Sequence, residues 1–130
     1  MDDGFPAGRL ENARAFRAAA HTAAELAGPG ENANPIVSLI VSAAIAYADA
    51  LTGTLRGRVN QQDHAAARKA LRDALGNRLP KSQERGFARI LEAKDDAQYG
   101  ATRGRLSQAR ELLEDLDAFA AWAEAELRRP

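Results

Sequence analysis

The sequence predicts an all-α domain, for three reasons. Alanine is the most frequent residue, with about 30 copies in 130 residues, and alanine loses the least free energy on entering a helix. Residues that favour strands are few, since aromatic side chains make up only 5% of the chain. Hydrophobic residues also recur at spacings of three and four along most of the length, which is the helical period.

One domain is expected, because 130 residues can bury a single core but not two. We expect a flexible N-terminal segment at residues 1–8, followed by a single helical domain at residues 9–130. Glycine, proline and capping residues divide that domain into four to five helices, which predicts an up-and-down bundle.

The first expected helix covers about residues 10–27 and ends at the sequence GPGENANP, residues 28–35. The second covers about residues 34–55. Asn34 is its expected N-cap and Pro35 its first helical residue, where a missing N–H costs nothing. Hydrophobic residues occupy nearly every side of this second helix, which predicts a central position surrounded by the other helices.

The longest apolar stretch is PIVSLIVSAAIAYADAL, residues 35–51. We interpret it as too short for a membrane span, and it is rich in alanine and interrupted by Asp49. The stretch therefore predicts a buried helix and no association with a membrane.

Two further helices are expected in the middle of the chain. One begins near Asp63, a good N-cap, and stops at Gly76, a good C-cap. The next begins at Ser82, whose hydroxyl can cap it, and continues to about Tyr99 before the break YGATRG.

The last helix has the most regular pattern. One apolar row is spaced alternately by three and four residues and comprises Leu106, Ala109, Leu113, Leu116, Ala120, Ala123 and Leu127. A second row lies beside it and comprises Leu112, Phe119 and Trp122. Both rows can belong to the core; alternatively, one row packs the bundle and the other meets a second copy of the chain.

Charge is unevenly distributed along the chain, although its net charge is zero. Residues 56–89 contain nine basic and three acidic residues, whereas residues 1–55 and 90–130 are each net acidic by three charges. A cationic patch of this kind can attract phosphates. A solvated basic helix face is the alternative, and the sequence leaves both open.

Several classes of site have no support in the sequence. There is no cysteine, so disulfides and thiolate metal sites are excluded, and the two histidines, His21 and His64, are too far apart to suggest a metal site. We interpret the acidic stretches DDAQY, residues 95–99, and EDLD, residues 114–117, as solvent-facing. Without a glycine-rich phosphate loop or a nucleophile elbow, we expect neither a cofactor nor a metal. The absence of a signal peptide predicts a cytoplasmic protein.

The order of these features resembles that of HEPN-domain proteins. The resemblance lies in the alanine-rich SLIVSAAIAYADALTGTLRG, in the histidine at a helix start, and in the tail ILEAKDDAQYGATRGRLSQARELLEDLDAFAAWAEAEL. It extends from about residue 9 to residue 128. It implies a helical bundle that dimerises, often beside a minimal nucleotidyltransferase, in prokaryotic toxin–antitoxin or defence systems.

The resemblance also implies a possible catalytic pair. Many HEPN proteins are metal-independent ribonucleases whose signature is an arginine, four to six intervening residues and a histidine, assembled across the dimer. Arg58 and His64 fit this spacing, as do Arg14 and His21. Val59 follows Arg58, where active members usually have a polar residue, and the pair follows the second helix, earlier than in those members. Several branches of the family keep the fold and lack the motif.

The local context favours Arg58 and His64 over Arg14 and His21. A histidine at a helix N-terminus is kept neutral by the helix dipole, so it can accept a proton. In a metal-free ribonuclease it would take the proton of the 2′-hydroxyl, while an arginine stabilised the charge on the phosphorane. The alternative is that Arg58 is a solvated charge and His64 a residue of the first helical turn.

Two functions are therefore expected. The first is a HEPN-like homodimeric interaction module without catalysis, which binds another protein such as a minimal nucleotidyltransferase. The alternative is a HEPN endoribonuclease that binds RNA and cleaves it with Arg58 and His64.

Overall fold

The computed structural model describes residues 4–56 and 64–129, and all regular structure in these ranges is helical. In chain order the elements are α1 (Phe5–Leu26), α2 (Asn34–Arg56), α3 (His64–Leu75), a 3₁₀ turn (Gly76–Arg78), α4 (Lys81–Glu92), α5 (Lys94–Tyr99) and α6 (Leu106–Leu127). The prediction of an all-α bundle is confirmed.

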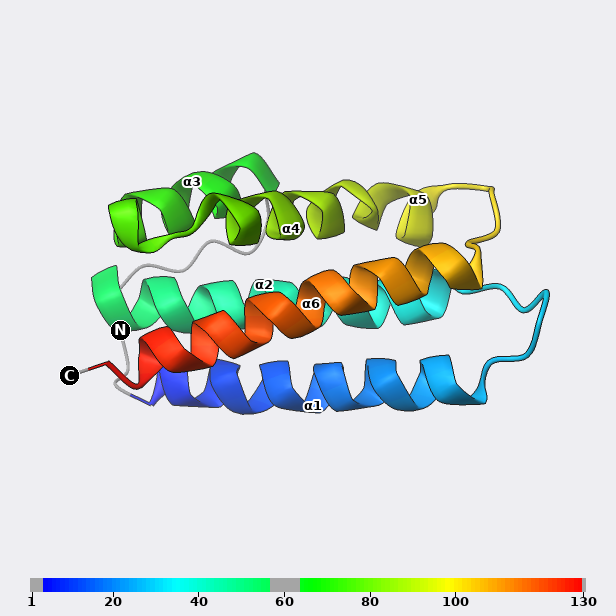
Figure 1. Cartoon of the computed structure of the whole chain (residues 1–130), viewed down its shortest axis with the longest axis horizontal. Helices are drawn as coiled ribbons and strands as arrows, with labels where there is room; N and C mark the ends of the chain where they lie inside the picture. The colour runs from blue at the N-terminus through cyan, green and yellow to red at the C-terminus, as the bar shows by residue number, and fades with distance from the viewer. Residues whose placement is uncertain (1–3, 57–63, 130) are drawn as a thin grey trace.

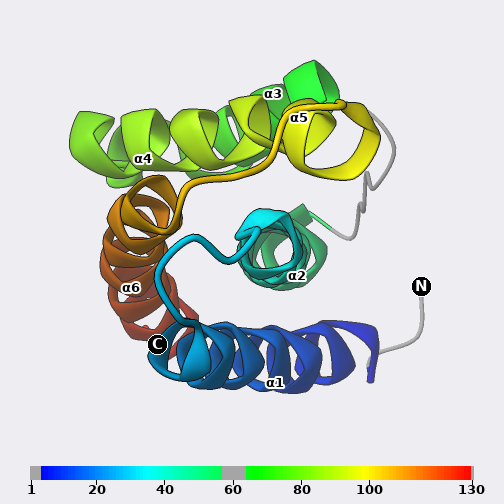
Figure 2. The same cartoon turned by 90° about the vertical axis from the view of Figure 1, so that its right-hand side faces the viewer.

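The helices surround α2. Helices α1 and α2 are antiparallel neighbours, and α6 lies beside both of them (Figure 1). Viewed along the bundle, α1 lies on one side of α2, α6 on a second, and the layer of α3, α4 and α5 on a third (Figure 2). The prediction that the second helix is central is therefore confirmed.

The apolar composition of α2 explains its position. Ile40, Val41, Tyr47 and Leu51 are each no more than 1% exposed. By length and composition alone, residues 34–53 could cross a membrane, so the expectation that the apolar stretch is too short for a span was wrong. Most of this segment is buried inside the bundle, as is typical of the core helix of a globular domain.

Small side chains let α1 approach α2 closely. Ala13, Ala20 and Ala24 lie on one face of α1 and are buried, and Ala43 of α2 is also fully buried. Alanine contributes high helix propensity and little bulk, so the two backbones can lie close together. The alanine-rich composition therefore determines packing as well as secondary structure.

Both apolar rows of α6 contribute to the core. In the second row, Leu112 and Phe119 are buried, and the Phe119 ring stacks on Phe87 of α4 with centroids 5.0 Å apart. Trp122 packs against Phe119 at a centroid distance of 5.6 Å and is partly exposed. The interpretation of both rows as core thus holds for Leu112 and Phe119, and Trp122 alone in that row reaches the surface.

The loop before α2 and the loop before α6 are joined by hydrogen bonds between residues 32–34 and 102–104, a contact that we call the loop clasp. Asn32 Oδ1 accepts hydrogen bonds from the backbone N–H groups of Asn34 and Gly104, at 3.1 and 3.0 Å. Asn34 is helical, and its side-chain amide donates to the Thr102 carbonyl oxygen at 2.9 Å. The expectation that Asn34 caps α2 was therefore wrong, because its side chain bonds to a distant loop.

Two other helix starts differ from expectation. Helix α1 begins at Phe5, with Pro6 in its first turn, so Phe5–Gly8 are helical within the segment 1–8 that was expected to be flexible. Helix α4 begins at Lys81 after Pro80, and no side chain caps it, so the expectation that Ser82 is the cap was wrong. Proline at the cap position leaves the first turn without a side-chain acceptor.

The ends of the middle helices agree better with the sequence. Helix α3 ends at Leu75, and Gly76 has a φ of +55°, which is the left-handed conformation expected of a glycine C-cap. The single helix expected up to Tyr99 is divided at Ala93, whose N–H is shared between the carbonyl oxygens of Arg89 and Ile90 at 3.3 and 3.2 Å.

Candidate functional site

The expected catalytic pair can be placed only in part. Arg58 lies outside the described residues, and so does the side chain of His64. The backbone of His64 is the first residue of α3, which agrees with the expected helix start near Asp63. The distance between the two side chains therefore stays untested.

Ion pairs neutralise much of the basic segment within its described part. Lys69 lies 2.7 Å from Asp73, and Arg72 lies 3.3 Å from Glu84. Two further pairs reach across to α6, where Arg78 contacts Glu126 and Arg89 contacts Asp115. The excess positive charge read from the sequence is thus partly compensated by acidic residues of neighbouring helices.

The side chains of the alternative pair, Arg14 and His21, do not meet at a common site. Arg14 Nε donates to Glu124 Oε2 at 3.0 Å. His21 Nε2 lies 2.7 Å from Asp117 Oδ1, and the same oxygen accepts from Arg17 Nε at 2.8 Å. Arg14 and His21 are each bound to a different carboxylate of α6, so these contacts join α1 to α6.

A partly buried hydrogen-bond bridge continues this junction into α2. The Tyr47 hydroxyl donates to Glu124 Oε2 at 3.2 Å. Burial and the charge of Glu124 raise the pKa of Tyr47, whereas the hydrogen bond from Arg14 lowers the pKa of the Glu124 carboxyl. Glu124 thus connects three helices in its ionised form.

A second bridge joins α1 to α2. Arg9 Nε and Nη2 donate to Asp49 Oδ2 at 3.2 and 3.0 Å, and Asp49 is only 2% exposed. A single acidic residue within an apolar helix is a sequence signal for such a buried pair, because an unpaired buried charge is costly. The partner 40 residues earlier could not be identified from the sequence.

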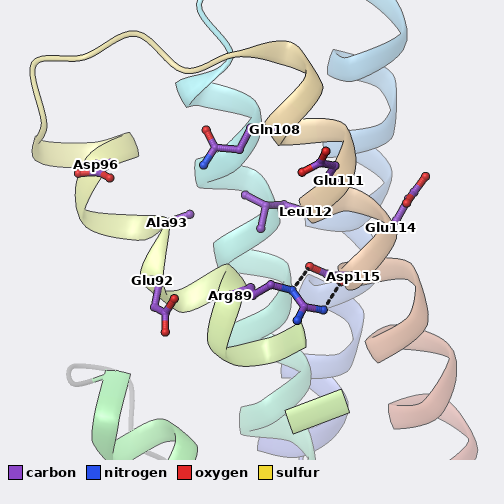
Figure 3. Close-up of a pocket in the computed structure, with 9 residues that line it drawn as sticks. All are labelled: Arg89, Glu92, Ala93, Asp96, Gln108, Glu111, Leu112, Glu114 and Asp115. Carbon is purple, nitrogen blue, oxygen red and sulfur yellow. Dashed lines mark hydrogen bonds and ion pairs between the residues drawn. The ribbon is translucent and has the colours of Figure 1, made fainter. Parts of the chain in front are cut away.

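A cavity of about 510 Å³ lies between α4–α5 and α6 (Figure 3). We call it the acidic cleft. Its lining contains five carboxylates, one arginine, one amide and two apolar side chains, namely Arg89, Glu92, Ala93, Asp96, Gln108, Glu111, Leu112, Glu114 and Asp115.

Figure 3 shows how the acidic cleft is built. Leu112 projects from α6 toward the α4–α5 wall, where Ala93 faces it, so the floor is apolar. Arg89 of α4 reaches across to Asp115 of α6, with hydrogen bonds of 3.0 and 2.8 Å, and connects the two walls (Figure 3).

A smaller cavity of about 170 Å³ adjoins the acidic cleft and shares Ala93, Asp96 and Gln108 with it. Val37 and Ala97 extend the apolar floor there. The two cavities therefore form one groove that leads toward the loop clasp.

The chemistry of the acidic cleft favours binding of cations. Its lining includes no histidine and no hydroxyl nucleophile, and its carboxylates outnumber the single arginine. Phosphates would be repelled by this charge, whereas ammonium and guanidinium groups would be attracted. Among residues 4–56 and 64–129 there is no group of three or more histidines, cysteines or carboxylates placed to hold a metal.

The cleft was not predicted from the sequence, although the two acidic stretches that contribute to it were identified there. Asp96, Glu114 and Asp115 belong to the two acidic stretches that were interpreted as solvent-facing; Asp96 and Glu114 are exposed, as expected, and all three line the cleft. Asp117, from the second stretch, pairs with Arg17 and His21. Only the pairing of α4–α5 with α6 brings the two stretches together.

Comparison with models of known protein families gives no match, and comparison with functionally characterised proteins gives none.

Proposed function

We propose that this chain is a HEPN-like protein-interaction module. It forms a homodimer in the prokaryotic cytoplasm and binds a protein partner, such as a minimal nucleotidyltransferase, in a toxin–antitoxin or defence system. The HEPN part of the proposal is supported by the sequence resemblance, and the all-α bundle is compatible with it.

The observation that favours binding over catalysis is the composition of the acidic cleft. The cleft contains no group suited to activate a 2′-hydroxyl at neutral pH or to hold a phosphate, apart from an arginine already bonded to Asp115. Outside the cleft, His21 is engaged by Asp117. A protein surface bearing basic side chains fits this chemistry better than RNA does.

The endoribonuclease remains the second candidate because α3 begins at His64. A helix N-terminus is the environment in which a neutral histidine can act as a general base. Catalysis would then depend on Arg58 and His64 together, and on a second protomer if the site is composite.

One set of measurements separates the two candidates. RNA cleavage in EDTA is compared between the unmodified chain, Arg58→Ala, His64→Ala and the control Arg85→Ala, whose exposed side chain has no ion pair among the described residues. We expect a dimer in sedimentation and no cleavage by any of the four proteins.

Two results would contradict this expectation. Cleavage that is lost in Arg58→Ala and His64→Ala but kept in Arg85→Ala would establish the ribonuclease instead. A monomer at micromolar concentration would remove both the homodimeric module and the composite ribonuclease site.

A further inference from the structure

We infer that the acidic cleft is a docking groove for a basic helical segment of a partner protein. This inference rests on the proposed interaction function and specifies the chemistry of the partner. It follows from three properties of the cleft, which are its charge, its floor and the spacing of its carboxylates.

The charge of the cleft is only partly compensated within the described chain, where Arg89 pairs with Asp115 and also interacts with the charge of Glu92. The side chains of Asp96, Glu111 and Glu114 form no hydrogen bond or ion pair with described residues. At the other junctions between helices the carboxylates are paired, namely Asp49 with Arg9, Glu84 with Arg72, Asp117 with Arg17, Glu124 with Arg14 and Glu126 with Arg78. Like charges placed together at a junction oppose folding, so the fold itself does not account for them.

The floor of the cleft selects the kind of cation. Leu112 and Ala93 form an apolar surface below the carboxylates, and Val37 and Ala97 continue it. Lysine and arginine carry long aliphatic stems that cover apolar surface while the charged head reaches outward. The stem of such a side chain would cover the apolar floor while its charged head paired with the carboxylates. A small hydrated cation would leave the floor exposed to water.

The spacing of the carboxylates favours a helix as the occupant. Glu111 and Glu114, both unpaired within the described chain, are three residues apart on α6, and Glu92 and Asp96 face them from either side of the break at Ala93. Residues three or four apart in a helix are separated by about 4.5–6 Å along its axis, and basic residues at positions i and i+3 or i+4 of a bound helix have the same separation. Such a helix would present basic residues in register with the carboxylates of the α6 wall. The cavity of about 510 Å³ has room for their long side chains.

The test uses a fluorescent alanine-based helical peptide with arginines at i, i+4 and i+7 and leucines between them. Its affinity is measured by anisotropy for the full chain, for the double variant Glu111→Gln/Glu114→Gln and for the control double variant Glu11→Gln/Glu25→Gln. All four glutamates are exposed and none has an ion pair among the described residues, so both doubles change the net charge equally without loss of folding. Circular dichroism checks that they fold.

We expect the cleft variant to bind the peptide at least about fivefold more weakly than the unmodified chain, and the control to bind as the unmodified chain does. A peptide with the same composition but scrambled arginine positions should also bind more weakly. Equal weakening in both doubles, no binding at all, or displacement of the peptide by an equal concentration of spermidine would overturn the inference. None of these results depends on dimerisation or RNA cleavage, so the two proposals can fail separately.

Discussion

At the scale of single residues, Gly104 shows how closely two loops are joined. A Cβ atom added at Gly104 would lie 2.9 Å from the backbone nitrogen of Asn34 and closer still to its side-chain oxygen. The glycine is required here by close approach, since its φ is not positive. Its N–H is also bound by Asn32, so the loop before α6 is attached directly to the start of α2.

Gly104→Ala should therefore lower the free energy of unfolding by about 1–3 kcal/mol, the usual cost of overpacking. The matched control is Gly8→Ala in α1, where an added Cβ meets nothing within 4 Å. The control should be neutral or more stable by about 0.5–1 kcal/mol, because alanine is the better helix former. Urea denaturation of both variants measures the difference, and equal stabilities would show that the contact with Asn34 is easily relieved.

At the scale of elements, the sequence predicted the interiors of the helices better than their ends. The rows of α6 and the apolar sides of α2 repeat over several turns, so chance cannot easily produce them. The caps at Asn34 and Ser82 were wrong because each prediction used one polar residue and its immediate neighbours. The true partner of Asn34 is Thr102, 68 residues away, and no local pattern indicates it.

The corrected start of α4 gives a prediction for Ser82. Replacement of a helix-capping serine by alanine lowers the free energy of unfolding by about 1 kcal/mol. Because Ser82 is exposed inside the first turn, we expect Ser82→Ala to change stability by less than about 0.5 kcal/mol.

The comparison variant for Ser82→Ala is Asn32→Ala, which leaves the N–H groups of Asn34 and Gly104 without their acceptor and should cost about 1 kcal/mol or more. Thermal melts of the two variants test this order. If Ser82→Ala proved the more damaging change, α4 would have to begin at Ser82 in solution.

At the scale of the whole molecule, the distribution of charge on the surface was also predicted incompletely from the sequence. Sums over segments gave a cationic middle, but ion pairs such as Arg78 with Glu126 and Arg89 with Asp115 cross between segments. The candidate site was missed for the same reason, since the walls of the acidic cleft become neighbours only in the fold. Arg58 and His64 could be proposed from spacing, yet spacing contains no information about the distance between their side chains.

Glu124 connects α1, α2 and α6, so its titration should affect the stability of the entire bundle. Its pKa is lowered from 4.5 in the folded chain, chiefly by the hydrogen bond from Arg14. The resulting stabilisation is present above pH 4.5 and is lost as the pH falls through the lower folded value. Glu124→Gln should therefore reduce the dependence of stability on pH in this acidic range.

Urea midpoints measured between about pH 3 and pH 6 would test this expectation. Glu25→Gln is the control, since Glu25 is exposed and has no ion pair among the described residues, and it should keep the dependence of the unmodified chain. Identical curves for Glu124→Gln and the unmodified chain would mean that the bridge contributes nothing measurable.

Both walls of the acidic cleft come from one continuous stretch of the chain, which affects how the cleft can be inherited. All 9 residues that line it lie between Arg89 and Asp115, so one short coding segment specifies both walls. Exchange of that segment between related genes would therefore replace both walls of the cleft in a single event, together with the core residues that it contributes, such as Ile90 and Leu113. A segment that keeps the apolar pattern of these core positions would change the charge of the cleft and preserve the packing against α2.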